Sequence, residues 1–138
     1  MGKNTFELEV GSRLSSLPVI SDFVAENMKK FAADPALVPR VQLAVDEAAT
    51  NIIKYAYGEK EGPLRLIMEL HGKVLMITLV SWGKPFDPTA VSAPDLTAGL
   101  EERRIGGLGM YLIRKMMDEV SYSFDPTGNR LIMKKNLA

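Results

Sequence analysis

The order of the hydrophobic periodicities along the chain is the feature that most restricts its fold. Phe6, Leu8 and Val10 alternate with glutamates, which is the two-residue period of a half-buried strand. Over residues 14–31 the apolar residues recur every three or four positions, which is the period of one helix face. These residues are Leu17, Ile20, Val24, Met28 and Phe31. The chain is therefore predicted to begin with a strand followed by an amphipathic helix.

A second helix is predicted to start near Asp34. Asp is a common N-cap residue, and Pro35 directly after it suits a first helical turn. Pro39 suits a first turn equally well, so both starting points stay open. The helix is predicted to stop near Gly58. The helical period is carried by Val41, Ala44, Val45, Ala48, Ala49, Ile52 and Ile53.

Two β-hairpins account for the remaining strands. Each combines two apolar or β-branched runs around a short segment containing Gly, which is the pattern of a tight turn. The first turn is Gly72–Lys73 and the second is Pro126–Thr127–Gly128. The predicted strands cover residues 64–70, 74–81, 120–124 and 130–134.

A long connection and a third helix separate the two hairpins. Residues 82–107 are rich in Pro and Gly and exceed an ordinary connection in length, which is typical of a functional lid. The helix is predicted over residues 109–117. This order of elements predicts one domain spanning residues 1–138. Its fold class is α+β, a two-layer sandwich with helices on one face of a mixed, mostly antiparallel sheet.

Composition and charge exclude several classes of function. Lys plus Arg and Asp plus Glu each number 17, and this balance disfavours nucleic-acid and anionic-membrane partners, which bind through excess basic residues. The absence of Cys excludes disulfides and thiolate sites, and the single His71 disfavours a His-based metal or catalytic site. No apolar run approaches the roughly 18 residues of a membrane span. We therefore expect a cytoplasmic protein.

The predicted middle helix carries an unusual polar pair. Glu47 and Asn51 are four residues apart, so they share one helix face, one turn apart. A carboxylate beside a carboxamide can hold a nucleophile and a divalent cation together, because hard cations prefer oxygen ligands. The alternative is a solvated face on which Asp46, Glu47, Thr50 and Asn51 all point outward. The spacing alone favours that alternative.

Two glycine-containing segments are further candidates. Gly106, Gly107, Leu108 and Gly109 lead into the third helix, where free backbone N–H groups and the helix dipole favour a phosphate. The segment lacks the Lys-Ser/Thr of a P-loop, and a hinge or tight turn is the alternative.

The second glycine segment, Ser81–Trp82–Gly83, follows the end of a predicted strand. Its polar groups could line a pocket. The alternative is a rim of the sheet in which Phe86 and Trp82 cover the core.

Taken in order, these motifs resemble the GHKL ATPase/kinase superfamily, and most closely its anti-sigma-factor serine kinases. The segment 47–51, Glu-Ala-Ala-Thr-Asn, resembles the N box of that family and is the most specific piece. Residues 81–88 resemble the first glycine box, residues 106–113 resemble the second, and residues 118–120 continue the pattern. The likeness covers nearly the whole chain.

The resemblance implies a Bergerat-type ATP-binding fold that binds ATP with Mg²⁺. Glu47 would be the catalytic base that accepts the serine proton, and Asn51 would coordinate Mg²⁺. The glycine segment from Gly106 to Gly109 would bind the phosphates of ATP. Ser81 and Gly83 would lie beside its adenine base. Phosphoryl transfer depends mostly on positioning and charge neutralisation, so few dedicated side chains are needed.

The resemblance also implies a biological role. Members of that family phosphorylate a serine on a small anti-anti-sigma protein of the STAS type, often sequester a sigma factor, and commonly form homodimers. The expected function is thus an ATP-dependent serine/threonine protein kinase that regulates transcription by partner switching, without nucleic-acid or membrane partners.

The chain departs from the family pattern at two positions. The family usually has Asp where Ser81 stands, and its carboxylate accepts a hydrogen bond from the adenine amino group. A hydroxyl accepts more weakly, by about 1 kcal/mol or more, which corresponds to about tenfold in affinity. Tyr55 stands where close relatives often carry His.

Ser81 therefore keeps a second function open, a non-catalytic sequestration module on the same fold with weakened nucleotide binding. A detached ATPase subunit of a larger GHKL machine is a third, weaker alternative, because no transducer domain accompanies it.

Overall fold

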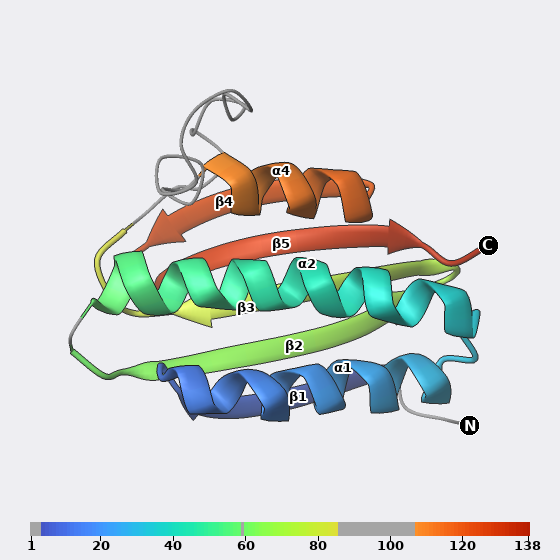
Figure 1. Cartoon of the computed structure of the whole chain (residues 1–138), viewed down its shortest axis with the longest axis horizontal. Helices are drawn as coiled ribbons and strands as arrows, with labels where there is room; N and C mark the ends of the chain where they lie inside the picture. Colours follow the sequence, from blue (N-terminus) through green and yellow to red (C-terminus); the bar gives the residue numbers. More distant parts are fainter. Residues whose placement is uncertain (1–3, 59, 86–106) are drawn as a thin grey trace.

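Five strands form one sheet, and helices cover a single face of it (Figure 1). The computed structural model describes residues 4–58, 60–85 and 107–138. Within these residues the strands are β1 (Thr5–Gly11), β2 (Pro63–His71), β3 (Val74–Ser81), β4 (Glu119–Asp125) and β5 (Gly128–Asn136). The α-helices are α1 (Leu17–Lys30), α2 (Val38–Asn51) and α4 (Gly107–Met116). This arrangement confirms the predicted two-layer α+β sandwich.

The strand order in the sheet is β1-β2-β3-β5-β4. Every pair among these strands is antiparallel, so the described sheet is more regular than the mixed sheet that was expected. The two predicted hairpins form β2–β3 and β5–β4, and β5 lies between β3 and β4. Consequently the C-terminal end of β3 lies beside the N-terminal end of β5, and Ser81 is paired with Asn129.

Short 3-10 turns precede the first two helices, so α1 starts later than predicted, and α2 starts one residue before Pro39. Leu14–Ser16 form a 3-10 turn before α1, and Pro35–Leu37 form another before α2. Asp34 accepts a hydrogen bond from the Ala36 N–H at 2.9 Å, and Pro39 lies in the first turn of α2. Both starting points that the sequence left open are therefore used, one for each helical segment.

The C-terminal end of α2 passes directly into a π-helix at Ile52–Tyr57. Each residue added to a helical turn rotates the side chains that follow, and π-helical turns are rare and often lie at functional sites. Gly58 ends the segment with a φ of 62°, in the left-handed region that suits Gly. The predicted end near Gly58 is confirmed, whereas the change of helix type was not predicted.

The core lies between the sheet and the three helices. Inward-facing residues of the central strands, such as Leu66, Ile77 and Leu131, are at most 2% exposed. Ala44 and Ala48 of α2 are fully buried against them, and their small side chains let the helix lie close to the sheet. Of the polar residues of α2, Glu47 and Asn51 lie on the flank of the helix that faces α4, whereas Gln42 donates to the Ser21 carbonyl of α1.

No helix in residues 4–58, 60–85 and 107–138 combines the length and the apolar character needed to cross a membrane.

Candidate functional site

Asn51 is the most unusual side chain of the middle helix. It is only 7% exposed, and its side-chain Nδ2 is a buried donor without a hydrogen-bond partner within the part of the chain that the structure describes. A buried donor left without a partner costs about 1–3 kcal/mol, so such groups are rare in native proteins, and a catalytic role or a bound water or ion is a common explanation. The solvated-face alternative is therefore wrong for Asn51.

Gly109 brings α4 against this polar pair. A Cβ atom built on Gly109 would lie 3.1 Å from both Glu47 Oε2 and Asn51 Nδ2. That is tighter than almost all real contacts of a Cβ atom, so any larger residue would have to displace the two side chains. Gly109 thus closes the distance between the first turn of α4 and the last turns of α2.

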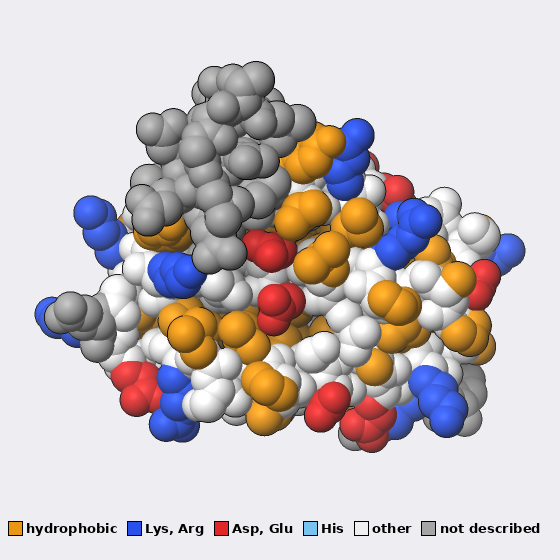
Figure 2. Space-filling view, viewed as in Figure 1, with side chains coloured by type: hydrophobic (Ala, Val, Ile, Leu, Met, Phe, Trp, Pro, Cys, Tyr) orange, Lys and Arg blue, Asp and Glu red, His pale blue; other side chains and the backbone are white. Residues whose placement is uncertain are grey.

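A cavity of about 320 Å³ lies where the two helices meet. Its wall consists of Asp46, Glu47, Thr50, Asn51, Lys54, Tyr55 and Gly109. The volume falls within the range of small-molecule sites. Figure 2 views the face of the molecule that the helices cover. Near the centre of this face, acidic side chains lie over α2 and over the boundary between α2 and α4, whereas basic side chains lie mostly around the edge.

Charges of both signs line this cavity. Burial raises the pKa of the Asp46 carboxyl above its ordinary value, because desolvation disfavours its ionised form. Lys54 lies in the π-helix three residues after Asn51 and is exposed. Lys54 was missed by the sequence analysis, although its spacing of three and seven residues from Asn51 and Glu47 placed it on the same side of a helix.

A second, much smaller cavity lies between the end of α2 and the sheet. Its volume is about 10 Å³, and its wall includes Ser81, Lys84, Tyr122 and Asn129. Ile52 and Ala56 of the π-helix form its upper side, together with Leu79 and Leu131 of the sheet. Because Asn51 lines the first cavity and Ile52 the second, the two cavities flank the same turn of helix.

Gly83 makes a close approach of the chain possible here. A Cβ atom at Gly83 would lie 2.5 Å from the carbonyl oxygen of Ala56, and the Lys84 N–H donates to that oxygen at 2.8 Å. Asn129 Nδ2 donates to the Gly83 carbonyl at 3.0 Å. The segment after β3 is therefore attached both to the π-helix and to β5.

Tyr57 attaches the same segment to the start of β2. Its hydroxyl accepts from the Trp82 N–H at 2.9 Å and donates to the Pro63 carbonyl. Trp82 itself is 42% exposed, and its indole N–H donates to the Thr127 carbonyl at 3.0 Å. The alternative in which Trp82 covers the core is therefore wrong, because the ring lies on the outside, near Arg65.

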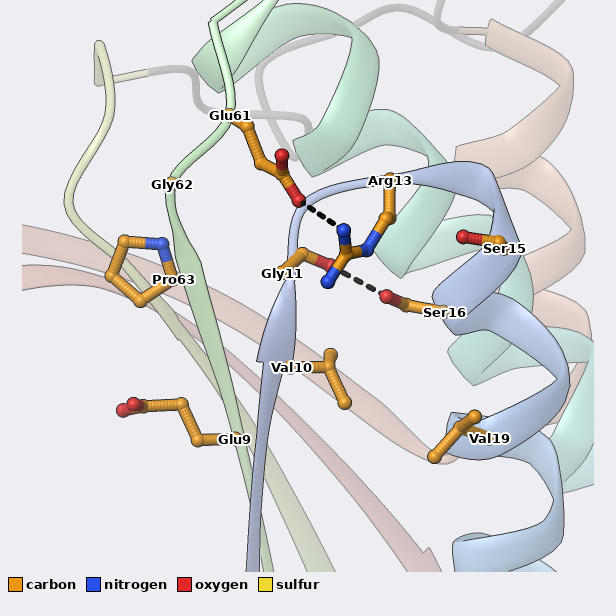
Figure 3. Close-up of a pocket in the computed structure, with 10 residues that line it drawn as sticks. All are labelled: Glu9, Val10, Gly11, Arg13, Ser15, Ser16, Val19, Glu61, Gly62 and Pro63. Carbon is orange, nitrogen blue, oxygen red and sulfur yellow. Dashed lines mark hydrogen bonds and ion pairs between the residues drawn. The ribbon is translucent and has the colours of Figure 1, made fainter.

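A larger cavity lies away from these residues. It measures about 740 Å³ and lies at the edge of the sheet, between the end of β1 and the start of α1 (Figure 3). Arg13 forms an ion pair with Glu61 at 3.1 Å across it, and Ser16 Oγ donates to the Gly11 carbonyl at 2.7 Å. None of the site residues predicted from the sequence lines this cavity.

The structure thus divides the predicted site residues into two groups. Glu47, Asn51 and Gly109 meet at the larger of the two cavities near α2, and Ser81 and Gly83 lie at the smaller one or beside it. Gly107 and Leu108 form the first turn of α4, which begins two residues earlier than predicted. These two residues are therefore helical in the structure, and their binding of phosphate stays a prediction.

Some predicted residues lie outside the described part of the chain. Gly106 and most of the predicted lid, residues 86–106, belong to this group. Asn129, in contrast, is described and was missed by the sequence analysis. Only the register of β3 with β5 places it beside Ser81.

Comparisons with known proteins identify the family. Residues 10–135 match the model of the histidine kinase-like ATPase domain. The chain is 31% identical over 113 residues to the serine-protein kinase RsbW of Bacillus cereus (strain AH820), which covers 79% of this chain and 69% of the relative. The match to RsbW of Bacillus anthracis (strain A0248) has the same identity and coverage.

Solved structures share the fold. The RsbU and RsbW domains of a Mycobacterium tuberculosis protein match 98% of this chain with a TM-score of 0.69 and 12% identity. A blue-light activated histidine kinase of Erythrobacter litoralis matches 76% with a TM-score of 0.56 and 19% identity. This chain spans about a third of each of these longer chains. It belongs to the histidine kinase-like ATPase domain family, and within that family to the group that includes the serine-protein kinases RsbW.

Proposed function

We propose that the chain is an ATP-dependent serine/threonine protein kinase. The observation that carries this proposal is the meeting of Glu47, Asn51 and Gly109 at one cavity, where the buried Asn51 Nδ2 has no hydrogen-bond partner among the described residues. A triphosphate supplies the acceptor oxygens that such an amide requires. The family to which the chain belongs supports the same substrate.

The residues at this cavity fit a nucleotide bound with Mg²⁺. The Asn51 carboxamide oxygen is a hard ligand of the kind that Mg²⁺ prefers, and its Nδ2 can donate to a phosphate oxygen. Mg²⁺, when bound, neutralises charge that develops on the phosphates. This neutralisation matters here because Asp46 and Glu47 place two carboxyl groups at the same cavity.

Glu47 is proposed as the catalytic base. In the transfer, the serine hydroxyl oxygen of the acceptor forms a bond to the γ-phosphorus, and the bond from that phosphorus to the β,γ-bridging oxygen breaks. ADP leaves with the electron pair of the broken bond, and the hydroxyl proton passes to the Glu47 carboxylate. The carboxylate need only be within hydrogen-bond reach of the serine, because positioning contributes most of the rate.

The phosphates are proposed to bind at the start of α4. The backbone N–H groups of Gly107, Leu108 and Gly109 lie in its first turn, where intrahelical acceptors are lacking and the helix dipole favours an anion. Gly106 is proposed to extend this cradle. Lys54, on the opposite wall, offers a positive charge to the same phosphates.

The base of the nucleotide is proposed to lie toward Ser81 and Gly83. Because Gly83 has no Cβ atom, the chain can pass close to the π-helix at this end of the site. A Cβ atom built on Gly83 would lie only 2.5 Å from the Ala56 carbonyl oxygen. The nucleotide would then follow the turn of helix that carries Asn51 and Ile52.

The proposed acceptor is a STAS-type anti-anti-sigma protein, and the proposed second partner is a sigma factor that the kinase sequesters. Together these roles describe a partner-switching regulator of transcription that acts as an anti-sigma factor, with a homodimer as its proposed assembly state. The similarity to RsbW serine-protein kinases supports this proposal.

Calorimetric titration with Mg-ATP and Mg-ADP tests nucleotide binding directly. The Glu47→Ala variant is expected to bind Mg-ATP within about twofold of wild type and to lose transfer of the γ-phosphate to a STAS-type acceptor. Asn51→Ala is expected to lose the part of the affinity that depends on Mg²⁺, at a cost of tenfold or more. A Glu47→Ala protein that still transfers phosphate at the wild-type rate would contradict the role of Glu47.

A sequestration module without catalysis is the second candidate. Ser81 in place of a carboxylate and the small size of the neighbouring cavity, about 10 Å³, favour it. Failure of the wild-type chain to bind Mg-ATP at millimolar concentration would select this candidate over the kinase.

A further inference from the structure

Ser81 has a buried polar partner on the neighbouring strand. Ser81 of β3 and Asn129 of β5 are paired directly in the register, and the two side chains are 2% and 7% exposed. Directly opposed residues on one face of a sheet have Cβ atoms about 5 Å apart. Both residues line the small cavity beneath the π-helix. The position at which the family usually offers a carboxylate is therefore shared here by a hydroxyl and a carboxamide.

The Asn129 carboxamide is held in one orientation. Its Nδ2 donates to the Gly83 carbonyl at 3.0 Å, and its Oδ1 accepts from the Tyr122 hydroxyl at 3.4 Å. The contact with Gly83 fixes the assignment of nitrogen and oxygen, because a carbonyl oxygen only accepts, and the Tyr122 hydroxyl is then left to donate to Oδ1. An amide oxygen has two lone pairs, and the contact with Tyr122 is long, so Oδ1 retains capacity as an acceptor.

We propose that Asn129 is the residue that selects the nucleobase, with its Oδ1 accepting a hydrogen bond from the exocyclic amino group of adenine. This inference rests on the proposed binding of ATP. Asn129 thereby supplies the acceptor that Ser81, without a carboxylate, provides only weakly. The cavity of about 10 Å³ has room for a group the size of one water molecule, which matches a single amino group.

The fixed orientation of the carboxamide makes the site selective. Adenine presents an amino donor where guanine presents a keto oxygen. A keto oxygen facing Asn129 Oδ1 would bring two acceptors together, and the Nδ2 donor that could rescue this contact is already bound to Gly83. The arrangement therefore favours ATP and disfavours GTP.

The test is the ratio of the dissociation constants for Mg-ATP and Mg-GTP, measured by calorimetry on the whole chain. Asn129→Ala is expected to weaken Mg-ATP about tenfold and to leave Mg-GTP unchanged or slightly tighter. The preference for ATP should therefore fall about tenfold. A purely structural role of Asn129 would instead weaken both nucleotides by the same factor.

Asn136→Ala provides the matched control. Asn136 lies on the same strand but is exposed and pairs with Val74 at the far end of β3. This variant should retain the wild-type dissociation constants for both nucleotides.

Asn129→Asp covers the case in which the alanine variant fails to fold. It keeps an acceptor at the same position, so the preference for ATP should persist even though the bond to Gly83 is lost.

A double-mutant cycle with Ser81→Asp separates this role from a general contribution to the pocket. The carboxylate of Ser81→Asp restores an acceptor, so Asn129→Ala in that background should cost Mg-ATP less than about threefold. Equal losses in both backgrounds would overturn the assignment.

The remaining outcomes are also distinguishable. Equal weakening of Mg-ATP and Mg-GTP by Asn129→Ala, or no change in either, would overturn the role of Asn129 while nucleotide binding stands. Absence of binding of either nucleotide to the wild-type chain would overturn the proposed function itself.

Discussion

Asp46 and Glu47 are consecutive carboxylates on α2 that line the same cavity. Burial raises the pKa of Asp46, so its ionised form is less stable in the folded protein than in the unfolded chain. An acid with a raised pKa takes up its proton at higher pH when folded. The free energy of unfolding therefore falls as pH rises from the ordinary Asp value of 3.8 through the folded-state pKa.

The Asp46→Asn variant should remove this penalty. Its free energy of unfolding is expected to exceed that of wild type near pH 7, and the difference should shrink as pH falls through the raised pKa of Asp46. Urea unfolding at a series of pH values measures the difference. A difference that does not change with pH would contradict the effect of burial.

Asp125→Asn is the control of opposite sign. Hydrogen bonds from Thr127, with Arg130 nearby, lower the pKa of the Asp125 carboxyl in the folded protein. This variant should therefore be less stable than wild type near pH 7, and the loss should disappear as pH falls through the lowered pKa.

At the scale of elements, the site depends on how closely α4 approaches α2. Each helix could be predicted from its own period, because apolar residues such as Val24 and Met28 mark one face. The close approach of α4 to α2 could not be predicted, because it depends on the absence of a Cβ atom at Gly109, beside Glu47 and Asn51. The π-helix also escaped prediction, since its residues Ile52 and Ile53 fit an α-helical period equally well.

Substitution of Gly109 tests this approach. Ala favours a helix by about 1 kcal/mol over Gly, and crowding against Glu47 and Asn51 opposes that gain. Gly109→Ala is therefore expected to change the free energy of unfolding by less than about 1 kcal/mol. It should weaken Mg-ATP at least tenfold in calorimetry, because the added Cβ atom would displace the side chain of Asn51, the proposed ligand, on the wall where the phosphates are proposed to bind.

Gly11→Ala is the matched control for that change. A Cβ at Gly11 would meet the flexible end of Glu61, 2.5 Å away, at the cavity of Figure 3 rather than at the proposed site. Unchanged affinity in both alanine variants would show that α4 does not hold the phosphates.

At the scale of the whole molecule, the antiparallel order β1-β2-β3-β5-β4 joins parts of the site that are distant in the chain. The hairpins could be predicted, because Gly72 and Gly128 mark their turns. The position of β5 beside β3 could not be predicted. Which strands are neighbours depends on pairing between distant parts of the chain, and the local hydrophobic periodicity carries no information on that pairing. Asn129 was missed for that reason, although Ser81 was found from its family position.

Binding of Mg-ATP at the proposed site is expected to stabilise the folded protein. A ligand that binds only the folded state at one hundred times its Kd adds about 2.7 kcal/mol to the free energy of unfolding. For a chain of this size each kcal/mol raises Tm by about 3 °C, so saturating Mg-ATP should raise Tm by about 8 °C. EDTA should remove most of the rise, because Asn51 is proposed to bind the nucleotide partly through Mg²⁺.

The variants decide which part of the molecule produces this stabilisation. Glu47→Ala should retain the rise in Tm with Mg-ATP, since its proposed role is to accept a proton. With Mg-ATP, Asn51→Ala should show only the smaller rise in Tm that the wild-type chain shows with ATP and EDTA. If the rise is the same in Asn51→Ala as in wild type, the nucleotide binds elsewhere, and the 740 Å³ cavity beside Arg13 becomes the first place to search.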